Sequence, residues 1–206
     1  MLSASEALAH LVEGNRRFAA GAPFAAARST AARRRQLAAS QAPHAAILGC
    51  SDSRAPVEIV FDQGLGDLFV IRVAGNIVAP SLIGSVEFAA ERFGTRLIVV
   101  LGHSSCGAVQ ATLEQLQQPV AAQSPNLAAI VDRIRPAVQG LLADGPARDP
   151  AALLAEAVRA NIRASAHQLR HGSPSIQHLI DSAGLLVVGA EYSLETGLVD
   201  FFEGRP

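Results

Sequence analysis

The sequence predicts an α/β fold around a mainly parallel β-sheet, with about four parallel strands, one antiparallel edge strand and flanking helices. Short apolar runs at 45–49, 68–73, 97–102 and 185–190 are each bounded by glycine or polar residues, as buried parallel strands are. Segments with helical spacing of apolar residues separate these runs. The chain has 206 residues, half of them hydrophobic, which is enough for one domain with a substantial core.

The chain begins with two predicted helices. Residues 3–20 form an amphipathic helix, because Ser3 or Ser5 can cap it and apolar residues recur at helical spacing. An arginine-rich stretch predicts a second helix over 28–40. We therefore expect residues 1–40 to form an N-terminal helical arm of a single domain that spans 1–206.

The strands and helices then alternate. Helices are predicted at the following places between and after the first three strands: 56–61, 81–93 and 106–118. A helical insertion follows over 125–143 and 150–171, with a loop at 140–150 and a kink or break at Pro136. A helix over 174–183 leads into the fourth strand. After a turn, residues 198–202 add an edge strand, and its adjacent phenylalanines invite pairing with another chain.

Charge and composition argue against several classes of protein. The formal net charge is −1, which gives no field that would attract nucleic acid or an anionic membrane. We interpret the basic cluster as a solvated or subunit-facing surface; it comprises Arg28, Arg33, Arg34 and Arg35. No run reaches the roughly 18 apolar residues of a membrane span, and the N-terminus lacks the features of a secretory signal. Two cysteines are too few for a disulfide framework, so a reducing compartment, the cytoplasm, is predicted.

Both cysteines directly follow predicted strands. Cys50 begins a Cys-x-Asp-x-Arg motif, and Cys106 ends a His-x-x-Cys motif that starts at His103. Ligands of open parallel sheets bind beyond the carboxyl ends of the strands, where both motifs lie. Zinc takes cysteine and histidine ligands, and a catalytic zinc keeps three protein ligands and an open fourth position. We therefore predict one Zn²⁺ per chain, bound by Cys50, His103 and Cys106. Two alternatives are that the cysteines are small buried hydrophobes or that they form a single disulfide.

Two further features of these motifs bear on chemistry. Cys106 lies near the first turn of a predicted helix, whose dipole is expected to lower the pKa of its thiol. Asp52 and Arg54 are two residues apart on a loop, so a guanidinium can hold the carboxylate bidentately and keep it ionised. A purely structural zinc site would not require such a pair, so its position beside Cys50 favours a catalytic role. The alternative is an ordinary loop salt bridge.

The combination of Cys-x-Asp-x-Arg with Gly-His-x-x-Cys-Gly at 102–107 resembles the β-class carbonic anhydrases. The similarity extends to the segments 14–18, 69–76, 85–89 and 189–192. The resemblance implies a lyase that hydrates carbon dioxide reversibly to bicarbonate and a proton, through a zinc-bound hydroxide. Asp52, oriented by Arg54, would accept the hydrogen bond of the attacking oxygen. Two thiolate ligands cancel the charge of zinc, so activity is expected to favour alkaline pH.

The same resemblance implies other features of the site and the assembly. Asp52 becomes a possible fourth zinc ligand in a closed state at lower pH. Gln63 and Gly107 are predicted to bind substrate. A homodimer or tetramer is expected, in which the N-terminal helix embraces a neighbouring subunit; the alternative is that this helix packs on its own subunit.

Bicarbonate-inhibited members of the family carry a Trp–Arg–Tyr triad. Arg72 and Tyr192 lie in the matching segments, but the tryptophan position is Ile47, and the chain contains no tryptophan. The sequence therefore does not predict bicarbonate inhibition at that place.

Two other functions compete with this prediction. A hydrolase of carbonyl sulfide or carbon disulfide could use the same metal ligands on a related fold. A zinc-bearing or redox-sensing binding module without turnover is the non-enzymatic alternative, and the Asp52–Arg54 pair counts against it. His167 and His171 have a spacing that can bind metal, but a solvated helix face is favoured for them.

Overall fold

The computed structural model describes residues 2–24, 29–118, 124–142 and 149–205. Its strands are β1 (Ala45–Cys50), β2 (Leu68–Val73), β3 (Leu97–His103), β4 (Leu186–Tyr192) and β5 (Val199–Glu203). Its helices are α1 (Ala4–Ala19), α2 (Ala31–Leu37), α3 (Val57–Val60), α4 (Pro80–Arg92), α5 (Gly107–Gln117), α6 (Pro125–Val138), α7 (Pro150–His171) and α8 (Pro174–Ala183). The described residues also contain two 3₁₀ segments, η2 (Ala74–Asn76) and η3 (Gln139–Leu142).

The strands form one sheet in the order β2-β1-β3-β4-β5. The first four are parallel, and β5 is antiparallel to β4, which confirms the predicted fold class. The chain leaves β1 on one side to form β2 and then crosses to the other side to form β3. The carboxyl ends of β1 and β3 therefore flank a topological switch point, the place where open α/β sheets bind ligands.

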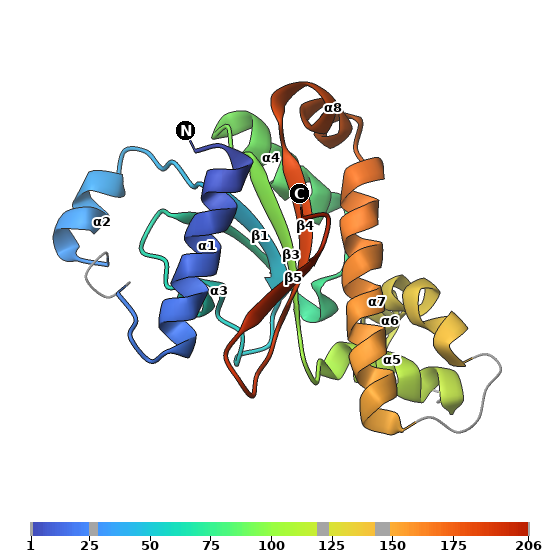
Figure 1. Ribbon diagram of the computed structural model, residues 1–206. Coiled ribbons are helices and arrows are strands. Elements are labelled where there is room, and N and C mark those ends of the chain that lie inside the picture. The colour runs from blue at the N-terminus through green and yellow to red at the C-terminus, as the bar shows by residue number, and fades with distance from the viewer. Residues whose placement is uncertain (1, 25–28, 119–123, 143–148, 206) are drawn as a thin grey trace.

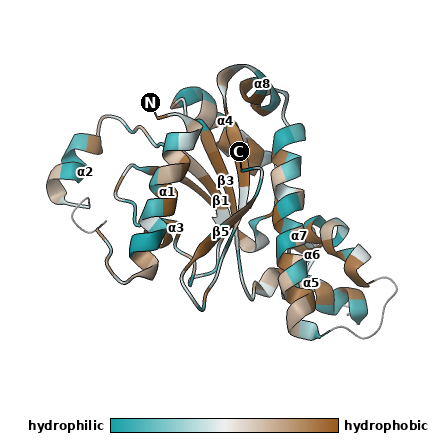
Figure 2. Ribbon diagram, in the orientation of Figure 1, coloured by the Kyte–Doolittle hydropathy of each residue, from teal (hydrophilic) through white to brown (hydrophobic). Residues whose placement is uncertain are grey.

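Helices cover both faces of the sheet (Figure 1). Helices α1 and α3 lie on one face, while α4, α7 and α8 lie on the other, and α5 and α6 pack beside α7. Successive strand residues alternate between the two layers, so that Ile47 packs on the α1 side and Leu48 on the α7 side. The central strands β1 and β3 are accordingly buried along their whole length, whereas the helices present hydrophilic residues outwards (Figure 2).

Helix α7 lies close to the sheet because two strand residues lack a side chain. A Cβ atom on Gly102 would lie 2.6 Å from Ile162 Cδ1, and one on Gly189 would lie 2.8 Å from Ile162 Cγ2. Ile162, which is fully buried, fills the space that these glycines leave on β3 and β4. The preceding residue, Asn161, thereby comes within reach of η2, the turn after β2.

Helix α1 packs on the sheet of its own chain, and its contact with a neighbouring subunit stays a prediction. Its buried residues contact the sheet, and the Asn15 side chain bonds the Val60 and Gly197 carbonyls and the Val199 amide. No helix in the described residues has the length and apolar character needed to cross a membrane.

One local prediction differs from the structure, and others fall partly outside the described residues. Helix α6 continues through Pro136 to Val138 and then passes into η3, so the helix does not break at the proline. A proline so near the end removes only one helical hydrogen bond. Arg28 and residues 143–148 of the predicted loop lie outside the described residues.

Candidate metal centre

The fold brings Cys50, His103 and Cys106 together at the switch point. Cys50 ends β1, His103 ends β3, and Cys106 caps the N-terminus of α5. Their ligand atoms lie within 4.8 Å of one another, and all three residues are buried. Across the described ranges, this is the one group of three such side chains that could hold a metal ion.

The spacing of the two sulfurs suits a metal ion and excludes a disulfide. Cys50 Sγ and Cys106 Sγ are 4.0 Å apart, and both cysteines are free. A disulfide bond needs about 2.05 Å. Two thiolates on a tetrahedral zinc, each at about 2.3 Å, would be about 3.8 Å apart. The sulfur pair therefore fits zinc with an adjustment of a few tenths of an ångström.

His103 is held in the tautomer that a metal ligand needs. Its Nδ1 lies 2.9 Å from the Ser104 carbonyl, so a proton on Nδ1 can donate there and leave the lone pair on Nε2. Nε2 is buried and has no hydrogen-bond partner, a costly state for a polar atom unless a metal ion binds it. Ser104 is itself tied to the end of β4, because its amide donates to the Tyr192 carbonyl and its Oγ accepts from the Leu194 amide.

The two sulfurs lie within hydrogen-bond distance of each other, and either thiol can be the donor. The contact with Cys106 lowers the pKa of Cys50 to about 4 despite its burial. The same contact, together with burial, raises the pKa of Cys106, although amides of α5 act in the opposite direction. The helix amides thus act on the pKa of Cys106 in the predicted direction, but the Cys50 sulfur and burial outweigh them.

The imidazole of His103 responds to the same negative charge. Burial opposes a charged ring, but the Cys50 sulfur, the Ser104 carbonyl and the Asp52 carboxylate outweigh it and raise the pKa of His103. This pocket therefore attracts positive charge, as a cation site must.

Asp52 and Arg54 form the predicted bidentate pair beside this cluster. Arg54 Nε donates to Asp52 Oδ1 at 2.9 Å, and Arg54 Nη2 donates to Oδ2 at 2.7 Å. The Arg54 backbone amide also donates to Oδ1. These bonds hold the pKa of Asp52 well below its usual range. Asp52 Oδ2 lies 3.8 Å from His103 Nε2, so the ionised carboxylate is directed at the metal-binding cluster.

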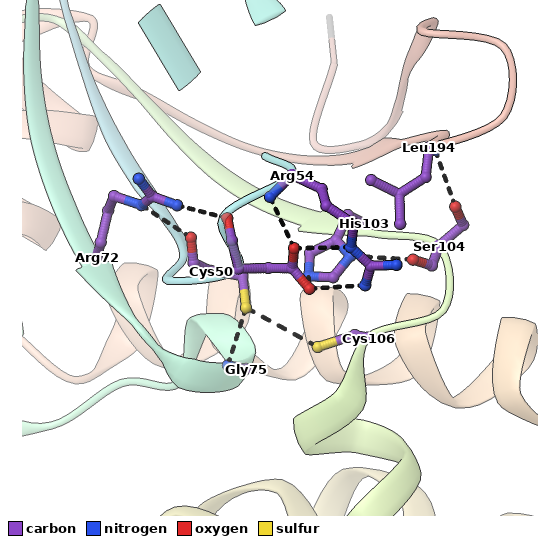
Figure 3. A network of polar contacts seen from close by, with 9 residues as sticks. Cys50, Arg54, Arg72, Gly75, His103, Ser104, Cys106 and Leu194 are labelled. Atoms are coloured by element: carbon purple, nitrogen blue, oxygen red, sulfur yellow. Dashed lines mark hydrogen bonds and ion pairs between the residues drawn. The ribbon is translucent and has the colours of Figure 1, made fainter. Parts of the chain in front are cut away.

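Arg72 holds the loop that carries Cys50 and Asp52, a role that the motifs did not reveal. From β2, its Nε donates to the Cys50 carbonyl at 3.0 Å and its Nη2 donates to the Asp52 carbonyl at 2.7 Å (Figure 3). The parallel register pairs Arg72 with Gly49, which places its side chain beside the end of β1. One guanidinium thus binds two carbonyls, two residues apart, of the same loop.

A backbone amide contacts one of the sulfurs. Gly75, in η2, donates its N–H to Cys50 Sγ at 3.3 Å (Figure 3), and its carbonyl accepts a hydrogen bond from Asn161. The sequence held a weak signal for both residues, a glycine two positions after a strand and an amide on the apolar face of a helix.

Comparisons with known proteins agree with this geometry. A family model described as carbonic anhydrase matches residues 45–199. The chain is 40% identical to carbonic anhydrase 2 of Mycobacterium tuberculosis over 187 residues, which cover 91% of this chain and 87% of that protein. The structure is similar to a Coccomyxa β-carbonic anhydrase solved in complex with acetazolamide, with a TM-score of 0.74, 26% identity, and coverage of 95% and 86% of the two chains.

The chain belongs to the β-class carbonic anhydrases. One of two tetrameric β-carbonic anhydrases from Sordaria macrospora is also similar, with a TM-score of 0.70, 26% identity, and coverage of 82% of this chain and 85% of that chain. The protein is accordingly an enzyme of the carbonic anhydrase class, whose general reaction is the hydration of carbon dioxide.

The two residues predicted to bind substrate in this carbonic anhydrase lie in different places. Gly107 follows Cys106 directly as the first residue of α5, and it is exposed. Gln63 is buried, donates to the Phe61 carbonyl and lines a hollow beside α1. The other residues of that hollow are His10, Glu13, Arg17, Ala22, Pro23 and Phe24. The structure therefore brings Gly107 to the metal-binding cluster and places Gln63 among residues that do not belong to it.

The three positions of the family's bicarbonate triad do not form one polar site in this carbonic anhydrase. Ile47 and Tyr192 are buried in the apolar layer on the α1 side, where the Tyr192 ring contacts Phe18. Arg72 instead binds the two loop carbonyls. Tyr192 pairs across the sheet with His103.

Proposed function

We propose that this enzyme hydrates carbon dioxide to bicarbonate and a proton at one Zn²⁺ held by Cys50, His103 and Cys106. The observation that carries the proposal is the convergence of three buried ligand atoms beside an ionised carboxylate. Zinc, when bound, acts as a Lewis acid that lowers the pKa of a water molecule towards neutrality. Two thiolates and a neutral imidazole match the charge of the ion.

Asp52 has the position and charge of a hydrogen-bond acceptor for the attacking oxygen. Arg54 binds one side of the Asp52 carboxylate with two parallel hydrogen bonds, which keep the carboxylate ionised and limit its rotation. In that state it cannot donate a hydrogen bond, so it can only accept one from a water or hydroxide, which directs a lone pair of that oxygen at carbon. The same carboxylate stays predicted as a fourth ligand in a closed state, since it need only leave Arg54.

The test separates metal binding from catalysis. We expect Asp52→Ala to keep one zinc per chain, by elemental analysis, and to lose about 100-fold or more of the carbon dioxide hydration rate. Asp132→Ala serves as the control, because Asp132 forms an exposed ion pair with Arg135 on α6. Unchanged hydration by Asp52→Ala would refute the role of Asp52. Wild-type protein without zinc, or one that turns over carbonyl sulfide faster than carbon dioxide, would overturn the proposed function itself.

We also propose that the enzyme is a homodimer or tetramer. The rings of Phe69, Phe88 and Phe93 cluster on the β2 and α4 side, and Phe88 is 51% exposed. Exposed apolar clusters of this kind are typical of protein interfaces. The similar Sordaria macrospora proteins are described as tetrameric. Light scattering over a range of protein concentrations tests this, and we expect Phe88→Glu to reduce the mass; a monomer at every concentration would contradict it.

A reducing compartment such as the cytoplasm is proposed for the enzyme, because both sulfurs must stay reduced to bind metal. Cell fractionation of the native protein tests this, and recovery in an oxidising compartment would contradict it.

A further inference from the structure

Gly75 connects the Cys50 sulfur to the middle of helix α7. Its amide donates to Cys50 Sγ at 3.3 Å, and its carbonyl accepts from Asn161 Nδ2 at 2.8 Å. The residue is therefore held at both ends, by the sulfur on one side and by a side chain 86 positions away on the other. A movement of Asn161 that releases the carbonyl removes one of these two hydrogen bonds that hold Gly75.

The conformation of this turn depends on such support. Gly75 has a φ of +73° and Asn76 a φ of +42°, so two successive residues lie in the left-handed region. Residues held in sparsely populated backbone regions persist where their surroundings over-determine them. The described hydrogen bond that ties the Gly75 carbonyl is the one from Asn161.

Asn161 is an unusual residue for its place in the helix. It is 2% exposed and lies between Val158 and Ile162 on the face of α7 that packs on the sheet. Asparagine is a poor helix former, and burying an amide is unfavourable unless it is hydrogen-bonded. The close approach of α7 to the sheet brings this amide to the Gly75 carbonyl.

Hydrogen bonds to a thiolate change how it binds a metal ion. An N–H donor withdraws electron density from the sulfur and fixes the direction of its lone pairs, and partners of this kind tune metal sites. Since Cys50 is a proposed zinc ligand, the position of the Gly75 amide affects both the donor strength of this sulfur and its orientation.

We propose that Asn161 is a positioning residue of the enzyme: by holding Gly75, it aims an N–H donor at the Cys50 sulfur and so sets the metal affinity and the electronic properties of the site. This inference rests on the proposed zinc site. It assigns a role to a residue on α7 that touches neither the metal ligands nor the Asp52–Arg54 pair.

Two substitutions test the proposal. Asn161→Leu keeps most of the volume and removes the donor, while Asn161→Asp keeps the shape and places an acceptor against the Gly75 carbonyl. We expect both to weaken zinc binding by about 10- to 100-fold in chelator competition. We also expect both to shift the sulfur-to-metal charge-transfer bands of the cobalt(II)-substituted protein. Thr95→Val is the matched control, because it removes a buried hydrogen bond, to the Pro43 carbonyl, at the opposite end of β3 from His103.

The outcomes distinguish the inference from the proposed function. If the Asn161 variants lose thermal stability but match the wild-type zinc affinity and cobalt spectrum, Asn161 is merely structural and the proposal is overturned. If Asn161→Leu does not fold, Asn161→Asp decides, since a packing role alone predicts wild-type affinity for this isosteric change. Failure of the proposed zinc site gives a different result, in which the wild-type protein shows no stoichiometric metal binding.

Discussion

Replacing Gly75 with alanine tests the geometry of the turn that faces the Cys50 sulfur. An alanine at a left-handed φ of +73° costs about 1–2 kcal/mol. Its Cβ would lie 2.8 Å from Ile134 Cδ1 and 3.1 Å from Ala108 Cβ. The end of the Ile134 side chain can turn, but the Ala108 methyl is fixed to its helix, so overpacking adds about 1–2 kcal/mol, towards the lower end of its usual range. The expected loss of unfolding free energy is about 2–4 kcal/mol.

The chain offers a glycine for which the opposite sign is expected. Gly84 lies inside α4, and a Cβ there would have no atom within 4 Å. Gly84→Ala should therefore stabilise the protein by about 0.5–1 kcal/mol, the usual gain for alanine over glycine in a helix.

Urea-induced unfolding of both variants and the wild type measures this difference. All three are compared at one protein concentration, because subunit association shifts the apparent stability. For a chain of this size, Gly75→Ala should also lower the melting temperature by about 4–16 °C. A Gly75→Ala protein within 1 kcal/mol of wild type (roughly the cost of the backbone strain alone) would refute the reasoning, since neither the strain nor the close contact would then be real.

Three further predictions follow from the site and its support. In zinc-stripped protein, the ultraviolet absorbance of one thiolate should persist at neutral pH and disappear as the pH falls through the Cys50 pKa of about 4. The stability that this lowered pKa provides should be lost over the same pH range. A midpoint of the absorbance change at the ordinary thiol pKa would contradict this. Arg72→Met should reduce the rate of carbon dioxide hydration about tenfold with zinc retained. Arg133→Met, which breaks a hydrogen bond only within α6, should leave the rate unchanged. Equal rates for both variants would exclude a role for the bonds of Arg72 to the Cys50 and Asp52 carbonyls. Ile162→Ala should destabilise the protein by about 4 kcal/mol in urea unfolding, because the backbones of the facing glycines cannot move into the cavity that it leaves. A loss of less than about 2 kcal/mol, the lower limit for such substitutions, would show that the structure around Ile162 relaxes into this cavity.

The sheet and the approach of the motifs could be predicted because both follow from local patterns. An apolar run followed by glycine marks a buried strand and its carboxyl end, so Cys50 and His103 could be placed at strand ends without knowing the sheet order. The parallel arrangement then brings such ends to one edge. The structure confirms the fold class and places the three predicted ligands together.

The support around the ligands could not be predicted because it depends on distances between segments. Arg72 reaches two carbonyls only because the register sets it opposite Gly49. Asn161 reaches Gly75 only because α7 lies close to the sheet. The net rise in the Cys106 pKa could not be predicted for the same reason, since a helix terminus is visible in the sequence but the approach of a second sulfur to 4.0 Å is not.

The pairing of Tyr192 with His103 has a practical consequence. The chain has no tryptophan and one tyrosine, and that tyrosine is buried directly across from the histidine of the metal-binding cluster. The tyrosine fluorescence of each chain therefore originates from one residue, which neighbours His103 in the sheet. Events there can be followed optically in the unlabelled protein, without a dye or an introduced chromophore.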